Sequence, residues 1–300
     1  MYRCWYGSWG RLLAVVSRSG IADAGTVLPR SLLLPSRTGC SVAISGDGST
    51  WTVLNAAAEL PWQLASSALH PSTGTRESPF AAIVLTDAEL DHVLGLLMLR
   101  QAATLTVAAT ATMRSLLECS GIVRLLGGYL QVTWREITAG AEFPLHPACP
   151  TGVLMRAIAV GAGKQPSYAG ADPASADATI GLVVSDPSGG SLLYAPCVPE
   201  LTGELLDACR SCSLILLDGT FFSDDELAEL GEHRTARRLR HLPVDGPDGS
   251  LVRLEPGFCS RVVYTHLNNT NPLLDEGSAA SDRVRRAGAA VAIDGAEYEL

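Results

Sequence analysis

Short apolar runs rich in β-branched residues recur along the chain and predict β-strands. These runs cover residues 41–45, 51–55, 81–86, 105–110, 179–185, 191–195, 213–219 and 261–267. Between several of them the apolar positions recur with the period of a helix, at residues 92–101, 110–119, 200–209 and 276–287. Strands and helices that alternate in this way indicate an α/β fold built in layers.

The pattern inside each run indicates how the sheets are covered. The run at 213–219 (SLILLDG) is almost continuously apolar, which is typical of a strand buried on both faces. The run at 131–137 (QVTWREI) alternates and predicts a half-exposed antiparallel strand. A mixed sheet or a pair of mixed sheets is therefore expected. Residues 163–178 are rich in Gly, Pro, Ser and Ala and predict a long loop, and long loops in compact domains are often functional.

Composition and charge narrow the class of protein. A chain of 300 residues with 47% hydrophobic and 18% charged residues can bury a large core and is not disordered. Its formal charge of −9 provides no basic field for nucleic acid or an anionic bilayer, so a small or peptidic partner is expected. The longest nearly apolar stretch, residues 93–99, is far shorter than the roughly 20 residues that a bilayer requires. We therefore expect a cytoplasmic protein without a membrane segment.

The segment at 86–92 (TDAELDH) carries the densest candidate chemistry. Three acids and an imidazole leave the end of a predicted strand together and precede an apolar helix: Asp87, Glu89, Asp91 and His92. Three carboxylates within five residues repel one another, so a bound cation would stabilise the cluster. Acidic residues also favour a helix N-terminus, so this segment alone leaves a metal site and a solvated helix start equally open.

Two further predicted strands end in residues that can bind a metal. Asp218 lies at the end of the run 213–219, and His266 lies at the end of the run 261–267. Because α/β folds assemble sites at the ends of buried strands, the repetition favours a shared site, with a turn cap and a core histidine as the alternatives. His241 lies in an arginine-rich stretch, and its local sequence alone predicts a surface residue.

The types of candidate ligand indicate the kind of metal centre. Histidines mixed with carboxylates suit Fe(II), Mn(II) or zinc in an open catalytic site better than they suit a structural zinc site. The sequence has no glycine-rich phosphate loop, no GxSxG nucleophile motif and no dinucleotide fingerprint. A metal centre is therefore favoured over serine catalysis and nicotinamide chemistry.

These motifs resemble a known family. A strand followed by Thr86, Asp91 and His92 is similar to the first metal-binding motif of the metallo-β-lactamase superfamily, which usually has histidines where Asp87 and Glu89 stand here. The pattern is closer still to the family of the B protein of pyrroloquinoline quinone (PQQ) biosynthesis, called PqqB, which carries Thr-Asp-x-x-x-Asp-His-x-x-Gly-Leu-Leu. The further matches are Asn55, Ala56, Gly95, Leu96, Leu97, Arg100, Tyr194–Pro196, Asp218–Thr220, Asp224–Leu227, His241, Leu242, His266 and Asn268–Pro272.

The resemblance covers roughly residues 38–300 and implies a fold. That fold is a metallo-β-lactamase-type αββα sandwich, in which two mixed β-sheets are flanked by helices. We expect a single domain over residues 1–300 with a divergent N-terminal segment, 1–37. This segment lacks the family's glycine-rich turn and clustered cysteines, so no structural N-terminal zinc is predicted. A family histidine is also missing near Ala178, and Arg240 stands where the family has glycine.

The resemblance also implies a function. Family members act in making PQQ from a Glu-Tyr-derived precursor, with iron- and oxygen-dependent hydroxylation of the tyrosyl ring. The leading hypothesis is therefore an Fe(II)-dependent hydroxylase that uses O2 on a tyrosine-derived or short peptide-derived aromatic substrate, with zinc or manganese as alternative metals. The expected ligands are Asp91, His92 and His266, and the residues expected to complete or orient this set are Asp218 and His241.

Two neighbouring residues and two other functions complete the hypothesis. Asp87 and Glu89 are expected to orient the ligands or to act as catalytic acid and base. A metal-dependent hydrolase would instead use a metal-activated water. A non-catalytic carrier of PQQ or of a pathway intermediate would keep a cavity and need no metal. The sequence leaves the exact substrate and the formation of a homodimer open.

Overall fold

The computed structural model describes residues 13–16, 20–21, 37–67, 69, 80–100, 102–146, 151–161, 165–169, 175–254, 257–258 and 260–300. Most of the N-terminal segment, for which no structural zinc is predicted, lies outside these residues, as does part of the predicted loop at 163–178.

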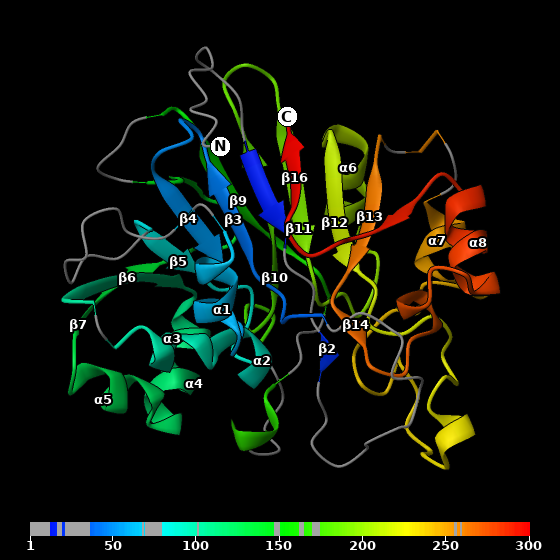
Figure 1. Ribbon diagram of the computed structural model, residues 1–300, viewed down its shortest axis with the longest axis horizontal. Helices are drawn as coiled ribbons and strands as arrows, with labels where there is room; N and C mark the ends of the chain where they lie inside the picture. The colour runs from blue at the N-terminus through cyan, green and yellow to red at the C-terminus, as the bar shows by residue number, and fades with distance from the viewer. Residues whose placement is uncertain are drawn as a thin grey trace.

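Within the described residues, the strands form two seven-stranded mixed sheets and one short pair (Figure 1). The first sheet consists, in spatial order, of β16 (Ala296–Glu299), β1 (Leu13–Val16), β3 (Val42–Ser45), β4 (Trp51–Leu54), β5 (Ala82–Val84), β6 (Thr104–Ala109) and β7 (Gln131–Glu136). Its first four strands pair antiparallel, and β4 to β7 pair parallel. The two ends of the described chain therefore lie side by side in this sheet. The antiparallel pairing predicted for residues 131–137 is wrong, because β7 runs parallel to β6.

The second sheet has the same division into a parallel and an antiparallel half. It consists, in spatial order, of β15 (Ala290–Val291), β13 (Val262–Thr265), β12 (Leu214–Asp218), β11 (Ser191–Ala195), β10 (Ile180–Ser185), β9 (Leu154–Ala159) and β8 (Glu142–Pro144). The strands from β15 to β11 pair parallel, and those from β11 to β8 pair antiparallel. The short pair joins β2 (Gly20–Ile21) to β14 (Leu267–Asn268).

Helices cover the outer faces of both sheets (Figure 1). Beside the first sheet lie α1 (Leu60–Ala65), α2 (Leu90–Val93), α3 (Gly95–Met98), α4 (Ala111–Ser120) and α5 (Ile122–Gly127). Beside the second lie α6 (Gly203–Ser211), α7 (Ser250–Arg253) and α8 (Ala279–Arg286). Short 3-10 turns are η1 (Ser167–Ala169), η2 (Ala228–Leu230) and η3 (Pro272–Leu274).

The core explains why the strands of the second sheet are continuously apolar. In β12, Leu216 packs into the cluster that lies between the two sheets, while its neighbours Ile215 and Leu217 belong to the cluster beneath α6, α7 and α8. Successive side chains of a strand point to opposite faces, so a strand buried on both faces needs an apolar residue at every position. The predicted sandwich of two mixed sheets flanked by helices is confirmed.

The predicted helix at 92–101 is wrong in its extent, because two short helices, α2 and α3, occupy this stretch. The backbone N–H of Gly95 donates to the carbonyl of Ala56 at 2.9 Å instead of continuing the helical ladder. A Cβ atom at Gly95 would lie 2.1 Å from the carbonyl oxygen of Ala57, so only glycine allows this approach. The break thus fixes the start of α3 against the chain that follows β4.

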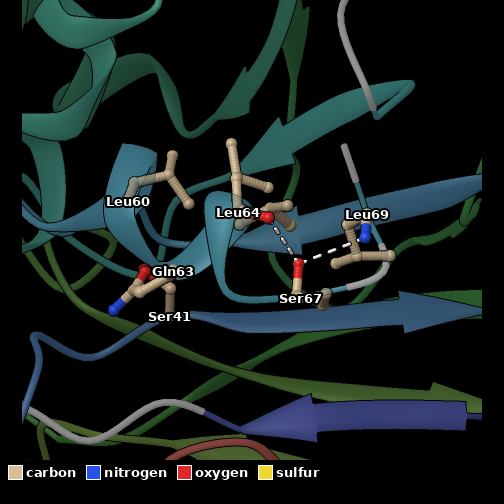
Figure 2. A pocket seen from close by; sticks show the side chains of 8 residues that line it. Ser41, Leu60, Gln63, Leu64, Ser67 and Leu69 are labelled. Atoms are coloured by element: carbon tan, nitrogen blue, oxygen red, sulfur yellow. Dashed lines mark hydrogen bonds between the residues drawn. The ribbon is translucent and has the colours of Figure 1, made fainter. Parts of the chain in front are cut away.

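A small apolar pocket lies between α1 and the first sheet (Figure 2). Leu60, Gln63 and Leu64 of α1 face Ser41 there, and Ser67 donates a hydrogen bond to the carbonyl of Leu64. The pocket has a volume of about 40 Å³. Since one water needs about 10–15 Å³ by this kind of measure, the pocket has room for a few waters and not for an aromatic substrate.

Candidate metal centre

The carboxyl ends of parallel strands from both sheets supply the polar residues of one site. These residues are Asn55 after β4, Asp87 after β5, Cys197 after β11, Asp218 at the end of β12 and His266 after β13. Strands β4 and β5 are parallel, and so are β11, β12 and β13. The site therefore forms where α/β folds commonly bind ligands.

His92 of α2 is fully buried and is held by a carboxylate. Its Nδ1 lies 2.8 Å from both oxygens of Asp87, and its backbone carbonyl accepts a hydrogen bond from the N–H of Ala56 at 2.7 Å. Its Nε2 has no hydrogen-bond partner among the described residues. The ring is thus fixed on one side and leaves one buried nitrogen available to a ligand.

The surroundings of His92 favour a protonated His92 beside an ionised Asp87 in the metal-free protein. Burial opposes protonation of His92, but the carboxylates of Asp87 and Asp91 outweigh burial and raise the pKa of His92 well above its ordinary value. Burial also opposes ionisation of Asp87, and the attraction of His92 outweighs it, so the pKa of Asp87 lies below its ordinary value. A divalent cation would replace the proton in this balance.

His266 connects the two halves of the site. Its Nε2 lies 3.0 Å from Oδ2 of Asp91, and its Nδ1 lies 2.7 Å from Oγ1 of Thr220. The centroid of its ring is 4.8 Å from that of His92. Its backbone has a φ of 58°, a left-handed conformation that a non-glycine residue adopts at a cost of about 1–2 kcal/mol. Such strain is common at functional sites.

Cys197 belongs to the site and is missing from the ligand set expected from the sequence. Ligand atoms of His92, Cys197 and His266 all lie within 4.8 Å of one another, and all three residues are buried. The sequence contained one weak signal, because Cys197 directly follows the matched Tyr194–Pro196 strand end. A lone cysteine among eight, without a nearby histidine in sequence, gave no reason to single it out.

Asp218 and His241 form a hydrogen-bonded pair beside this ligand set. Oδ2 of Asp218 lies 2.8 Å from Nδ1 of His241 and accepts from the N–H of Val198, while Oδ1 accepts from the N–H and the hydroxyl of Thr220. Every acceptor oxygen of Asp218 is therefore engaged. The ring of His241 stacks on that of His266 with centroids 5.6 Å apart. Asp218, His241 and His266 also have ligand atoms that all lie within 4.8 Å of one another, so these three buried residues form a second group that could hold a metal.

The burial of His241 corrects the interpretation of its local sequence. Its neighbours Arg237, Arg238 and Arg240 are exposed, but His241 is only 2% exposed. The local composition predicts a surface residue because it contains no information about the pairing with Asp218, which is distant in the sequence. That pairing also lowers the pKa of Asp218, since the attraction of His241 outweighs the effect of burial.

The two expected acid and base residues have different surroundings. Asp87 is 1% exposed and holds the ring of His92. Glu89 is half-buried, and its backbone N–H donates to Asp87 at 3.0 Å. Tyr168 donates a hydrogen bond to the carbonyl of Ala88, the residue between them, at 2.5 Å. Burial, followed by the charges of Glu89 and Asp87, raises the pKa of Tyr168.

The donors fit a divalent metal ion. A buried ring nitrogen without a partner is costly, and a metal-binding histidine usually donates its other nitrogen to a carboxylate, as His92 does to Asp87. Two imidazoles and the thiol of Cys197 form one group of donors, and the carboxylate of Asp91 lies next to it, 3.0 Å from Nε2 of His266. Thiolate and imidazole together suit zinc, whereas two imidazoles and one carboxylate suit Fe(II).

Comparison with known proteins decides the family. The beta-lactamase superfamily domain profile matches residues 50–277. Coenzyme PQQ synthesis protein B of Pseudomonas protegens is 37% identical over 284 residues, which cover 90% of each chain. The protein of the same name from Ruegeria pomeroyi is 36% identical over 266 residues, which cover 87% of each chain. The chain belongs to the PqqB family.

Solved structures agree with this placement in the PqqB family. The crystal structure of Zn²⁺-bound PqqB from Methylobacterium extorquens is 27% identical with a TM-score of 0.86, covering 96% of this chain and 100% of that one. The metallo-β-lactamase fold protein YhfI from Bacillus subtilis is 9% identical with a TM-score of 0.63, covering 97% and 100%, and shares the fold alone. The predicted metallo-β-lactamase-type αββα sandwich is thereby confirmed.

The structure explains one departure from the PqqB pattern. Arg240 stands where the resemblance to the family implies a glycine, and its φ is 65°. Among the described residues, the other non-glycine residues with positive φ are Asn55 and His266. A left-handed backbone favours glycine, which has no Cβ atom, so an arginine at this position carries conformational strain.

The described helices also bear on the expected absence of a membrane segment. None of them is long and apolar enough to cross a bilayer.

Proposed function

We propose that this member of the PqqB family acts in PQQ biosynthesis, or in a related pathway, as an Fe(II)- and O2-dependent hydroxylase of a tyrosine-derived aromatic precursor. The observation that carries the proposal is the convergence of Asp91, His92 and His266. Nε2 of His266 meets Asp91, and the two imidazole rings lie 4.8 Å apart. Two histidines and one carboxylate with open positions are the ligand set of non-haem iron oxygenases.

In this proposal the chain's own residues hold and shield the metal. His92 would bind through Nε2 because Asp87 holds Nδ1, and Asp91 and His266 would bind beside it. A bound Fe(II) would supply the activation of O2 that hydroxylation requires. Asp218 holds His241 stacked on His266, and these residues would either complete the ligand set or, through the ring of His241, move a proton beside it. Glu89 remains proposed as a second acid or base.

One observation favours a second candidate, a zinc-dependent hydrolase. Cys197 adds a sulfur donor beside the two histidines, and thiolate ligands select zinc over iron in a mixed site. The PqqB of Methylobacterium extorquens crystallised with Zn²⁺ bound. A bound zinc would supply a water of lowered pKa. This candidate predicts turnover of ester, lactone or phosphodiester probes without O2.

Metal analysis separates these candidates. The wild-type protein, the double variant Asp91→Ala/His92→Ala and a control variant, His233→Ala, would be purified without added metal. His233 is exposed and lies outside the candidate ligand groups. The hydroxylase predicts near-stoichiometric iron in wild type and control, loss of iron in the double variant, and O2 uptake with tyrosine-derived compounds.

The other outcomes count against the hydroxylase. Zinc that is lost in the double variant, together with no O2 uptake after reconstitution with Fe(II), would favour the hydrolase. No metal in any of the three proteins, and no binding of added Fe(II) or Zn²⁺, would leave a carrier of PQQ or of a pathway intermediate as the remaining hypothesis.

A further inference from the structure

A chain of buried side chains lies behind His92, on the side away from its open nitrogen. The side-chain amide of Asn55 contacts Thr86, and the hydroxyl of Thr86 contacts Oδ2 of Asp87 at 2.9 Å. Asp87 in turn holds Nδ1 of His92. All four residues are at most 1% exposed. The candidate ligand set by itself assigns neither Asn55 nor Thr86 a role in metal binding.

The directions of these hydrogen bonds follow from one backbone group. The N–H of Thr86 can only donate, and it donates to Oδ1 of Asn55 at 2.9 Å. Nδ2 of Asn55 is therefore the donor, and it donates to the hydroxyl oxygen of Thr86 at 2.9 Å and to the hydroxyl oxygen of Tyr194 at 3.2 Å. The Thr86 hydroxyl has two acceptors within reach, Oδ1 of Asn55 at 3.2 Å and Oδ2 of Asp87 at 2.9 Å, and the shorter contact to the charged oxygen is the stronger one.

The same amide also connects the two sheets. Tyr194 lies in β11 of the second sheet, and its hydroxyl accepts from Asn55, so its proton is left for the sulfur of Cys40 at 3.1 Å. The backbone of Asn55 is left-handed, with a φ of 61°. A strained, fully buried amide that satisfies groups on both sheets is a costly arrangement to keep for packing alone.

We infer that Asn55 and Thr86 are positioning residues for the metal centre. They fix the carboxylate of Asp87 so that it binds Nδ1 of His92 and leaves Nε2 directed to the ion. This inference rests on the proposed metal site and adds two residues to it. Neither residue is a metal ligand, and both act through Asp87. Partners of this kind typically change metal affinity by about 10–100-fold when they are removed.

The test compares zinc affinities of four folded proteins by competition with a chelating dye, with Zn²⁺ alone as the probe. Thr86→Val keeps the shape and removes the hydroxyl, whereas Thr86→Ser keeps the hydroxyl. Thr52→Val is the matched control, because Thr52 is also a buried strand threonine, and its hydroxyl donates to the carbonyl of Leu145 at 3.1 Å. Urea unfolding of each metal-free protein measures the cost to stability separately.

The inference predicts that Thr86→Val binds zinc about 10–100-fold more weakly than wild type, that Thr86→Ser recovers most of the affinity, and that Thr52→Val binds as wild type does. Unchanged zinc affinity in Thr86→Val would overturn the inference. An equal loss in Thr52→Val would overturn it too, because the loss would then reflect general destabilisation.

Two more variants complete the design. If Thr86→Val does not fold, Asn55→Gly replaces it, since glycine tolerates the φ of 61° while the amide is lost, and the same loss of affinity is expected. His92→Ala distinguishes a failure of the proposed metal site from a failure of the proposed positioning role. Zinc binding that survives His92→Ala contradicts the metal site itself, whereas binding lost in His92→Ala but kept in Thr86→Val contradicts only the role of the positioning residues.

Discussion

Replacing Arg240 by glycine should make the protein more stable. The backbone of Arg240 has a φ of 65°, and its side chain is exposed and forms no ion pair within the described part of the chain. A left-handed conformation costs a residue with a Cβ about 1–2 kcal/mol, and glycine adopts it without that cost. Glycine loses more backbone entropy on folding, by about 0.5–1 kcal/mol. The net gain in the free energy of unfolding should lie near the middle of the resulting range of about 0–1.5 kcal/mol.

Equilibrium unfolding in urea, followed by circular dichroism, measures this gain directly. The matched control is Arg238→Gly, two residues earlier in the same exposed stretch, where φ is not positive. This control should lose about 0.5–1 kcal/mol, because the entropic cost acts there without relief of strain. A thermal midpoint that rises by about 1–3 °C in Arg240→Gly would agree with the urea result.

The reasoning would be refuted if the two variants lost the same free energy of unfolding. Metal content provides a further check, since Arg240 precedes His241. The hydrogen bond of His241 to Asp218 does not involve the side chain of Arg240. Arg240→Gly should therefore keep the metal content of the wild-type protein.

Three other predictions concern the site and its surroundings. Cys197→Ser should weaken zinc binding by more than about 100-fold, which exceeds the usual effect of residues that only orient ligands. The same variant should weaken Fe(II) binding much less. Competition with a chelating dye measures the affinity for each ion. Asp218→Asn should lower the free energy of unfolding by about 1–3 kcal/mol in urea, because its amide nitrogen would face the donors that the carboxylate now accepts from. Burial opposes ionisation of Asp177, but hydrogen bonds from the hydroxyls of Ser175 and Thr112 outweigh burial and lower the pKa of Asp177. The ionised carboxylate therefore stabilises the fold above the ordinary pKa of 3.8, and this stabilisation is lost as the pH falls through the lower pKa of the folded protein. Asp177→Asn should therefore be less stable than wild type at pH 7, and the difference should shrink in unfolding experiments at progressively lower pH.

The strands predicted best are those buried on both faces. The runs at 213–219 and 261–267 contain β12 and β13, because burial on two faces leaves a continuous apolar signal in the sequence. Strand β9 (Leu154–Ala159) was not predicted, since Arg156 interrupts its run and forms an ion pair with Glu204 on the surface. The position of β9 in the sheet depends on its pairing with β10, and a local sequence pattern gives no information about that pairing.

Several residues that meet at the candidate site were singled out from the sequence, whereas Cys197 and the role of each residue were not. The resemblance to the PqqB family implied Asp91, His92 and His266 as ligands, and in the structure His266 lies beside both Asp91 and the ring of His92. Which residue could bind an ion depends on which atoms already have partners. The open Nε2 of His92 and the fully engaged oxygens of Asp218 are results of tertiary geometry, and no sequence pattern reports them.

The position of the candidate ligands has a consequence for the lifetime of the protein. Asp91 and His92 follow a strand of the first sheet, whereas Cys197 and His266 follow strands of the second, and Asp91 and His266 are 175 residues apart in the chain. An ion held by both groups would close a very long loop, and cross-links of that span remove the most freedom from an unfolded chain. Since binding to the folded state alone shifts the folding equilibrium by mass action, scarcity of such an ion would make the chain less stable and more exposed to proteolysis.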